Sequence, residues 1–240
     1  MERRARSSGA RPTDHEQDSP LAAHRYHFDE RYRERTELAD GTRVELRVVG
    51  PADRELLRRG FDRLSGRSRY QRFMGVKAQL SDAELDMLTS LDGTNRFGIG
   101  AVRLGAGAEP EGLGVARFAR LPDDPAVAEA AVTVVDGAQR RGLGSLLLRR
   151  LAAAARERGV TRFRAEILAS NEPMRRLLAA HVDATVEADG DVVRVLVELP
   201  SFSSLMKRPV AGGDLLGRLL AQAAGGGITV RLGDVLLKRR

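Results

Sequence analysis

The segment with the most evident chemistry lies at residues 139–145. It reads Gln139, Arg140, Arg141, Gly142, Leu143, Gly144 and Ser145. An apolar run at residues 128–135 precedes it and an apolar face with helical spacing follows it, so the segment should link a buried strand to a helix. The first N–H groups of a helix have no partner within the helix and lie at the positive end of its dipole. The segment therefore predicts a binding site for a phosphate or pyrophosphate group.

The residue types of the same segment also suit a phosphate. Gly142 and Gly144 let the backbone approach the anion, while Arg140 and Arg141 can donate charge-assisted hydrogen bonds to its oxygens. An ordinary strand-to-helix turn with surface arginines would have a similar sequence, and this alternative stays open. A second Gly-Leu-Gly, at residues 112–114, runs directly into a predicted strand and offers no helix end to an anion. It is an internal control for the motif.

A carboxylate lies in the strand that leads to this turn. Glu129 and Thr133 are the two polar side chains of residues 128–135. A buried carboxylate is costly without a partner or a function, so Glu129 is a candidate functional residue. The alternative is a place at the open end of the strand, solvated or paired with an arginine.

The elements that would position these residues follow from the periodicity of the chain. Residues 42–48 alternate apolar and charged side chains and should form a half-buried strand. Two helices should follow, one capped by Asp53 and one by Ser81, with Glu84 completing a capping box. Further strands are expected at residues 97–104, 113–120, 128–135, 162–168 and 192–199, and further helices at residues 143–159 and 172–180. Together they predict a mixed α/β domain.

Composition and charge disfavour several classes of function. The chain has 240 residues, 42% of them hydrophobic, and it has no cysteine, which excludes disulfides, thiolate metal ligands and a cysteinyl acyl-enzyme. The net charge is +7, but residues 201–240 alone contain 7 basic and 2 acidic side chains, so nucleic acid is disfavoured as a partner. No apolar run approaches the roughly 20 residues of a membrane span, and we expect a cytoplasmic protein without membrane contact. The histidines lack paired ligands at metal-binding spacing, so no metal is expected.

Three regions follow from these patterns. Residues 1–40 are polar, mixed in charge and without a sustained period, and we expect a disordered N-terminal arm in which a helix near Tyr32 stays open. Residues 41–200 should form the folded domain. Residues 201–240 should form a basic C-terminal tail, whose docking on the domain also stays open.

The motif and the element order resemble a known family. Residues 139–144 resemble the acetyl-CoA signature of the GNAT acetyltransferases, and the order of elements agrees with that family over residues 42–200. The resemblance implies a GNAT fold: a strand, two helices, three strands, the motif helix, a strand, a helix and a hairpin around a mixed central sheet. Within the family, three passages resemble the catalytic domain of bacterial protein-lysine acetyltransferases. They are residues 64–73, 128–132 and 168–174.

The resemblance implies an activity and a set of contacts. Acetyl-CoA would donate the acetyl group and an amine, favoured as a protein lysine, would accept it with Glu129 as the base. The strand backbone at Val132, Thr133 and Val134 would contact the pantetheine arm, residues 139–145 would hold the pyrophosphate, and Asn171 would contact the cofactor from the far side. Asn171 is also a good helix cap. The acceptor could instead be a small-molecule amine or a protein N-terminus, or the chain could be a catalytically weak acyl-CoA-binding module.

Two departures from the family pattern concern the leaving group and the acceptor. Many GNAT enzymes have a tyrosine seven residues after the asparagine, and Leu178 occupies that position here. The source of the proton for the departing thiolate is therefore open. A glycine-phenylalanine pair commonly follows the helix, whereas residues 180–183 here are Ala-His-Val-Asp, which leaves the acceptor side open as well.

Overall fold

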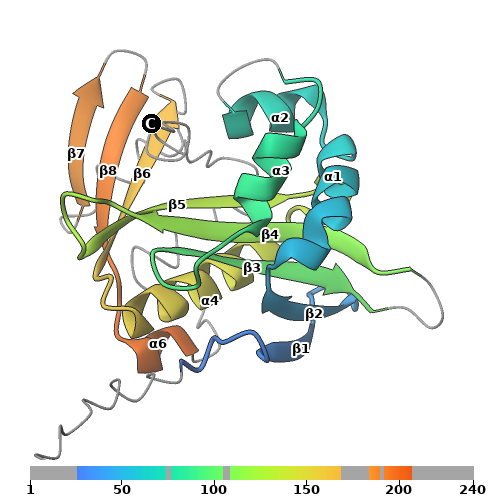
Figure 1. Cartoon of the computed structure of the whole chain (residues 1–240), viewed down its shortest axis with the longest axis horizontal. Coiled ribbons are helices and arrows are strands. Elements are labelled where there is room, and N and C mark those ends of the chain that lie inside the picture. Colours follow the sequence, from blue (N-terminus) through green and yellow to red (C-terminus); the bar gives the residue numbers. More distant parts are fainter. Residues whose placement is uncertain (1–25, 74–76, 105–108, 169–183, 190–191, 207–240) are drawn as a thin grey trace, which may run out of the picture.

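In the residues that it describes, 26–73, 77–104, 109–168, 184–189 and 192–206, the computed structural model contains one mixed sheet of eight strands (Figure 1). The strands are β1 (Arg33–Glu37), β2 (Arg43–Val48), β3 (Arg96–Arg103), β4 (Glu111–Arg120), β5 (Val127–Val134), β6 (Arg162–Leu168), β7 (Ala184–Asp189) and β8 (Val192–Glu198). Their spatial order is β1-β2-β3-β4-β5-β6-β8-β7. All neighbours are antiparallel except β5 and β6, which are parallel.

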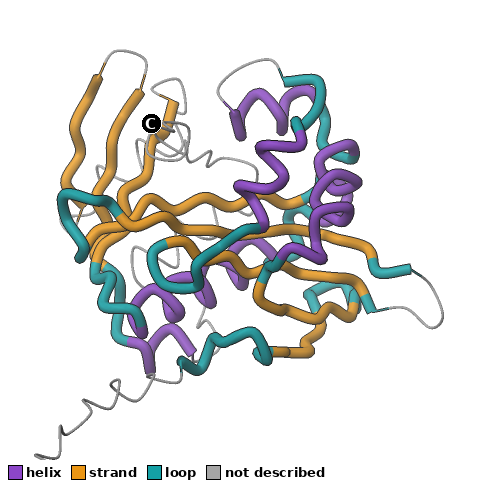
Figure 2. The backbone as a smooth tube through the Cα atoms, viewed as in Figure 1, coloured by secondary structure: helices purple, strands orange, loops and turns teal. Residues whose placement is uncertain are grey.

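Helices cover both faces of this sheet (Figures 1 and 2). They are η1 (Pro51–Asp53), α1 (Arg54–Asp62), α2 (Gly66–Phe73), α3 (Asp82–Thr89), η2 (Asp136–Ala138), α4 (Leu143–Glu157) and α6 (Phe202–Met206). α4 packs on β3, β4 and β5 from one face, whereas α1 packs on β4 from the other and contacts α3. α4 buries Leu143, Leu147 and Leu151, each of which contributes about 1.5–3 kcal/mol by leaving water. Packing therefore fixes α4 and the turn at its N-terminus.

The GNAT order of elements is confirmed where the chain is described. The predicted strands agree with β2 to β6 and β8 to within two residues at each end. The predicted capping box is also present, because Ser81 Oγ accepts a hydrogen bond from Glu84 N at 3.3 Å and Glu84 Oε2 accepts one from Ser81 N at 2.9 Å. The helix predicted at residues 172–180 lies outside the described residues.

The prediction for Asp53 is correct in position and wrong in role. Asp53 is the N-cap residue of α1, but its side chain makes no capping hydrogen bond to that helix. It is buried, forms an ion pair with Arg47 and accepts a hydrogen bond from Gly50 N at 3.0 Å. The carboxylate thus ties the end of β2 to the start of α1. A tertiary ion pair took precedence over the local cap.

The prediction of a disordered arm as far as residue 40 is wrong for residues 26–40. Arg33–Glu37 forms β1 and pairs with β2, and no helix forms at Tyr32. Phe28, Tyr32 and Leu38 are buried in the core. The strand shows little apolar period because it lies at the edge of the sheet, where charged side chains face solvent and protect the edge. Residues 1–25 lie outside the described residues.

Two further differences concern helices. α2 (Gly66–Phe73) is a separate short helix, whereas we expected α3 to be the next helix after α1. α6 begins at Phe202, inside the expected tail, and buries Leu205. Backbone carbonyls of α6 at Ser204 and Leu205 accept hydrogen bonds from the guanidinium groups of Arg149 and Arg150 at 2.9 and 3.1 Å. The folded region therefore extends past residue 200, at least to Met206.

Candidate active site

Strands β5 and β6 separate soon after they begin to pair. The ladder contains only Val127 with Arg162, Ala128 with Phe163, and Glu129 with Arg164. Beyond these pairs β5 continues beside β4, whereas β6 diverges from it and continues beside β8 (Figure 1). Among the described residues, the edge of β5 that faces β6 is consequently unpaired over residues 130–134. We call this backbone the β5 edge.

The direction of the backbone groups along β5 follows from their partners. Val135 N donates to Leu113 O at 2.9 Å, and Val127 O accepts from Leu121 N at 2.9 Å, so odd-numbered residues direct their polar groups toward β4. Successive residues of a strand point these groups to opposite sides. The N–H groups of Ala130, Val132 and Val134 are therefore directed toward the β5 edge. An extended ligand could pair with them as an added strand would.

The turn after β5 has the backbone geometry of an anion site. Arg140 has φ 61°, and Gly142, the N-cap residue of α4, has φ 85°. Gly142 adopts this left-handed conformation without the steric cost that a Cβ would add. Its carbonyl accepts from Leu146 N at 3.0 Å, which is the first N–H of the helix bonded in this way. The N–H groups of Leu143, Gly144 and Ser145 precede it and remain to bind a ligand.

The two arginines of the turn differ in their surroundings. Arg141 forms an ion pair with Asp40, in the connection between β1 and β2. Arg140 is exposed, and no ion pair links it to another described residue. Arg140 is thus the side chain better placed to meet a phosphate, whereas Arg141 also ties the turn to the N-terminal part of the fold.

Gln139 closes the turn. Its Nε2 donates to Val134 O at 3.1 Å and lies 3.4 Å from Ser68 Oγ in α2. The side chain therefore spans from the end of β5 to a helix that is distant in sequence. In this position it supports the turn. Its expected contact with the cofactor stays a prediction.

Asp136 makes a second connection between the turn and α2. Its carboxylate accepts hydrogen bonds from Ser65 N at 2.9 Å, Ser65 Oγ at 2.8 Å and Ser68 Oγ at 2.9 Å. Burial alone would raise the pKa of Asp136, but the hydrogen bonds from Ser65 and Ser68 outweigh it and hold this pKa below the usual value. Asp136 is therefore a carboxylate at neutral pH.

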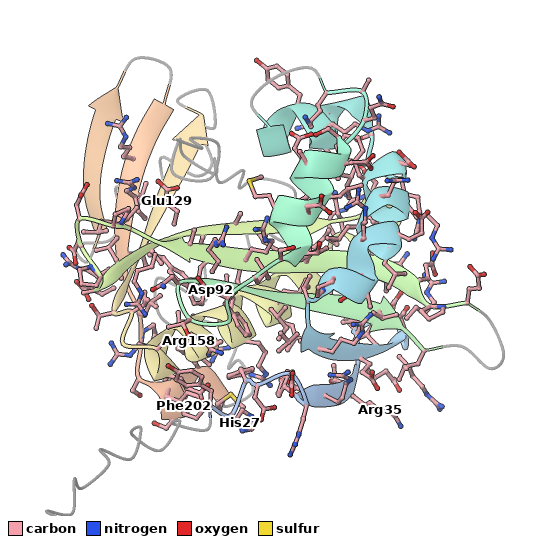
Figure 3. All side chains as sticks on the ribbon, viewed as in Figure 1. His27, Arg35, Asp92, Glu129, Arg158 and Phe202 are labelled. Atoms are coloured by element: carbon pink, nitrogen blue, oxygen red, sulfur yellow. The ribbon has the colours of Figure 1, made fainter. Side chains whose placement is uncertain are left out.

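Glu129 lies at the last paired position of β5 and β6 (Figure 3). It is 3% exposed and forms an ion pair with Arg164, which is its neighbour across the ladder. This pairing agrees with the alternative that we left open, except that the carboxylate is buried and not solvated. Its side chain shares a face of the sheet with Thr133, because residues two and four apart in a strand point the same way.

That face also has an apolar cavity of about 100 Å³ beneath α1. Leu56 and Phe61 of α1 and Leu64, which follows that helix, line it from above, and Thr133 lies on its wall. Gly112 also lines the cavity, and a Cβ there would lie in van der Waals contact with the carbonyl oxygen of Leu56, at 3.5 Å. The cavity holds several water-sized groups and lies on the side of the sheet to which Glu129 points.

Some predicted site residues cannot be placed and two contributors were missed. Asn171, which was expected to contact the cofactor, lies outside the described residues, as do Leu178 and residues 180–183. Sequence reasoning did not single out Arg164 or Asp136. Arg164 is recognisable only once the register of β5 and β6 is known, whereas Asp136 stood next to the motif and directly after the buried strand.

Two other features bear on the site. No group of three or more potential metal ligands occurs among the described residues. None of the helices in the described part of the chain is long and apolar enough to cross a membrane.

Two strand predictions near the site can also be compared with the structure. Val132 and Val134 are buried in β5. Residues 112–114 lie within β4, so the second Gly-Leu-Gly is confirmed as a strand segment.

Comparison with known proteins gives consistent results. The family model "Acetyltransferase (GNAT) family" matches residues 82–181. Acetyltransferase Pat of Mycolicibacterium smegmatis is 32% identical over 164 residues, which are 68% of this chain and 48% of Pat. Acetyltransferase PA5475 of Pseudomonas aeruginosa is 33% identical over 143 residues, 60% of this chain and 76% of that protein. The match thus spans about half the length of Pat.

A solved structure is similar over nearly its whole length. The GNAT domain of PAT from S. lividans superposes with a TM-score of 0.59 and 31% sequence identity. The superposition covers 70% of this chain and 97% of that domain. The mixed α/β fold of this chain therefore matches that of a GNAT domain.

Proposed function

The chain belongs to the GNAT acetyltransferase family, and from this premise we propose that it transfers the acetyl group of acetyl-CoA to an amine, with a protein lysine as the favoured acceptor. GNAT acetyltransferases use acetyl-CoA as the donor. One observation carries the proposal for this chain. The N–H groups of the β5 edge and those at the start of α4 lie on either side of the turn at residues 135–142, and Glu129 lies where the β5 edge begins.

The residues present fit acetyl-CoA. The N–H groups of Leu143, Gly144 and Ser145 would hold the pyrophosphate, with Arg140 adding charge from the exposed side. The amides of a pantetheine arm would pair with the N–H groups of Ala130 and Val132 as an added strand does. No metal is needed for either contact.

The chemistry requires one proton acceptor and one oxyanion donor. A neutral amine nitrogen attacks the thioester carbonyl carbon, the new C–N bond forms, and the C–S bond breaks to release the CoA thiolate. Glu129 accepts the proton that the amine gives up, directly or through water. A strand N–H such as that of Val134 would stabilise the negative charge on the carbonyl oxygen. Arg164 holds the Glu129 carboxylate in place, and water can protonate the thiolate.

The lysine acceptor rests on sequence resemblance. Residues 64–73, which include α2, and residues 128–132, which include Glu129, are two of the passages similar to bacterial protein-lysine acetyltransferases. The names of Pat and PAT describe those proteins as acetyltransferases and do not specify an acceptor. A small-molecule amine or a protein N-terminus is the alternative acceptor. A cytoplasmic location stays a prediction.

One observation favours a second candidate function. Glu129 is buried and paired with Arg164, as a structural carboxylate would be. If the pair is only structural, the chain would bind acyl-CoA without efficient transfer and would act as a regulatory module. Binding of acetyl-CoA without turnover is the result that this candidate predicts.

The proposal is tested by incubating the protein with acetyl-CoA and a cell extract and identifying the acetylated products by mass spectrometry. We expect new acetyl groups on lysine side chains that are absent when acetyl-CoA is omitted. Acetylation confined to N-termini or to small amines would replace the favoured acceptor. Binding of acetyl-CoA with no acetylated product would replace the enzyme by the regulatory module.

A further inference from the structure

Asp136 connects α2 to the turn that would bind the coenzyme. It lies in η2, between β5 and the turn that begins at Gln139. Its three hydrogen bonds reach Ser65 and Ser68, about 70 positions earlier in the chain. A carboxylate that accepts three hydrogen bonds needs donors held in fixed positions. The contact therefore fixes the start of α2 against the coenzyme turn.

The donors are the capping residues of α2. Ser65 precedes the helix, and its Oγ accepts from Ser68 N at 3.2 Å while its carbonyl accepts from Arg69 N at 2.9 Å. The same hydroxyl donates its own hydrogen to Asp136. A carboxylate beside a helix N-terminus is also favoured by the helix dipole. Asp136 thus completes the cap of α2 from a different part of the chain.

A second link joins the same helix to the strand. Gln139 Nε2 lies within hydrogen-bonding distance of Ser68 Oγ and donates to the carbonyl of Val134. The N–H group of Val134 is directed toward the β5 edge. The path from the strand to α2 thus passes through two side chains of the turn. α2 lies on the same side of the sheet as α1 and α3 (Figure 1), the side to which Glu129 points.

We propose that Asp136 is a positioning residue that joins α2 to the coenzyme turn, so that binding of acetyl-CoA at the turn also fixes α2 on the acceptor side. This inference rests on the proposed function, because it assumes that residues 142–145 hold the pyrophosphate. The two sites are then coupled. Each ligand therefore binds more tightly when the other is already bound.

The test is hydrogen exchange of the full chain with and without CoA, followed by mass spectrometry. Exchange reports local opening, so a ligand that fixes a segment slows its exchange. We expect CoA to slow exchange in residues 139–146 and in residues 66–73 of the unaltered protein. In Asp136→Asn, CoA should still slow exchange in residues 139–146, but the effect on residues 66–73 should fall by at least about half.

Matched variants separate coupling from a loss of stability. Asp92 is another carboxylate that accepts three hydrogen bonds, from the backbone N–H groups of Thr94, Asn95 and Arg96 at 2.7–2.9 Å. Asp92→Asn should lower stability to a similar extent and leave the response of α2 to CoA unchanged. Ser68→Ala should act like Asp136→Asn, whereas Ser68→Thr keeps the hydroxyl and should restore the response.

Steady-state kinetics give a second readout. Asp136→Asn should raise the KM for the amine about 3- to 10-fold at saturating acetyl-CoA and change kcat less than about 3-fold, because Glu129 is untouched. An equal loss in Asp92→Asn would overturn the inference.

The outcomes distinguish the two levels of the argument. If CoA fails to protect residues 139–146 in the unaltered protein, the proposed function fails. If CoA protects residues 139–146 but not residues 66–73, or if Asp136→Asn leaves the protection of residues 66–73 intact, the positioning role of Asp136 fails and the proposed function stands.

Discussion

Arg164 of β6 donates a hydrogen bond to the carboxylate of Glu129 in β5 at the last position where these two strands are paired. The pair therefore lies where the β5 edge begins. Glu129 is 3% exposed, and the side chain of Arg164 is 34% exposed. The same contact that anchors the parallel strands also orients the proposed base.

Removal of Arg164 should leave Glu129 buried without this partner. We expect Arg164→Gln to lower the free energy of unfolding by about 1–3 kcal/mol, less than for a fully buried pair because Arg164 is partly hydrated. Arg162 is the matched control, since its side chain is 31% exposed, much like that of Arg164, while its partner Asp124 is 43% exposed. Arg162→Gln should cost less than about 1 kcal/mol in the same urea titration. Equal losses of stability in the two variants would show that the ion pair of Glu129 with Arg164 stabilises the fold no more than that of Arg162 with Asp124.

Acetyl-CoA should stabilise the unaltered protein by about 2.7 kcal/mol at 100 times its Kd. Gly144→Glu should abolish this stabilisation, because a negatively charged side chain would enter the phosphate site. Gly112→Glu looked a suitable control from sequence, but a side chain there would be forced beneath α1. Gly137 is exposed, and no atom of a described residue lies within 4 Å of a Cβ built on it, so Gly137→Glu is the better control.

The stabilisation is measured as the shift in unfolding temperature that acetyl-CoA causes. Two results would contradict the assignment of the turn as the phosphate-binding site. One is the absence of any shift in the unaltered protein at millimolar acetyl-CoA. The other is an equal loss of the shift in Gly144→Glu and Gly137→Glu. Circular dichroism of each variant without ligand checks that the fold is intact.

The N-terminal strand should contribute a stability that depends on pH. Glu34 of β1 accepts two hydrogen bonds from the buried Arg150, at 2.6 and 2.7 Å. Burial alone would raise the pKa of Glu34, but the hydrogen bonds from Arg150 and Tyr32 lower it below 4.5 overall. A carboxylate with a lowered folded-state pKa stabilises the fold above its unfolded-state pKa and loses that effect as the pH falls through the folded-state value.

Glu34→Gln should therefore lower the free energy of unfolding by about 3 kcal/mol at pH 7, because Arg150 stays buried without its carboxylate. The difference from the unaltered protein should shrink as the pH falls below about 4.5. Glu37→Gln, an exposed position in the same strand, should change stability by less than about 0.5 kcal/mol. A difference for Glu34→Gln that is constant from pH 7 to pH 3 would rule out the ionic contribution.

The local parts of the site could be predicted from the sequence. Glycine spacing after an apolar strand fixed the position of the turn, and the Ser81 and Glu84 box fixed a helix start, because both patterns act over a few residues. The parts that depend on tertiary contacts could not. Arg164 becomes a partner of Glu129 only through the parallel register, and Ser65 reaches Asp136 only in the folded chain.

β1 was missed for a related reason. An edge strand with charged side chains has the composition of a disordered arm, and its order comes from β2 and from the Glu34 contact with Arg150. β2 follows after only residues 38–42, but Arg150 is more than 100 positions away in the chain. Periodicity therefore located the central strands well and the edge strand poorly.

The central claim is direct transfer of acetyl to an amine with Glu129 as the base, and the pH dependence of turnover in Glu129→Gln tests it most directly. Turnover should be measured with saturating acetyl-CoA and amine from pH 7.5 to pH 10. The account predicts unchanged affinity for acetyl-CoA and a loss of about 10² to 10⁴ in turnover at pH 7.5, which shrinks toward pH 10 as solvent supplies neutral amine. Retention of more than about half of the turnover at pH 7.5, or a deficit that stays constant with pH, would contradict it.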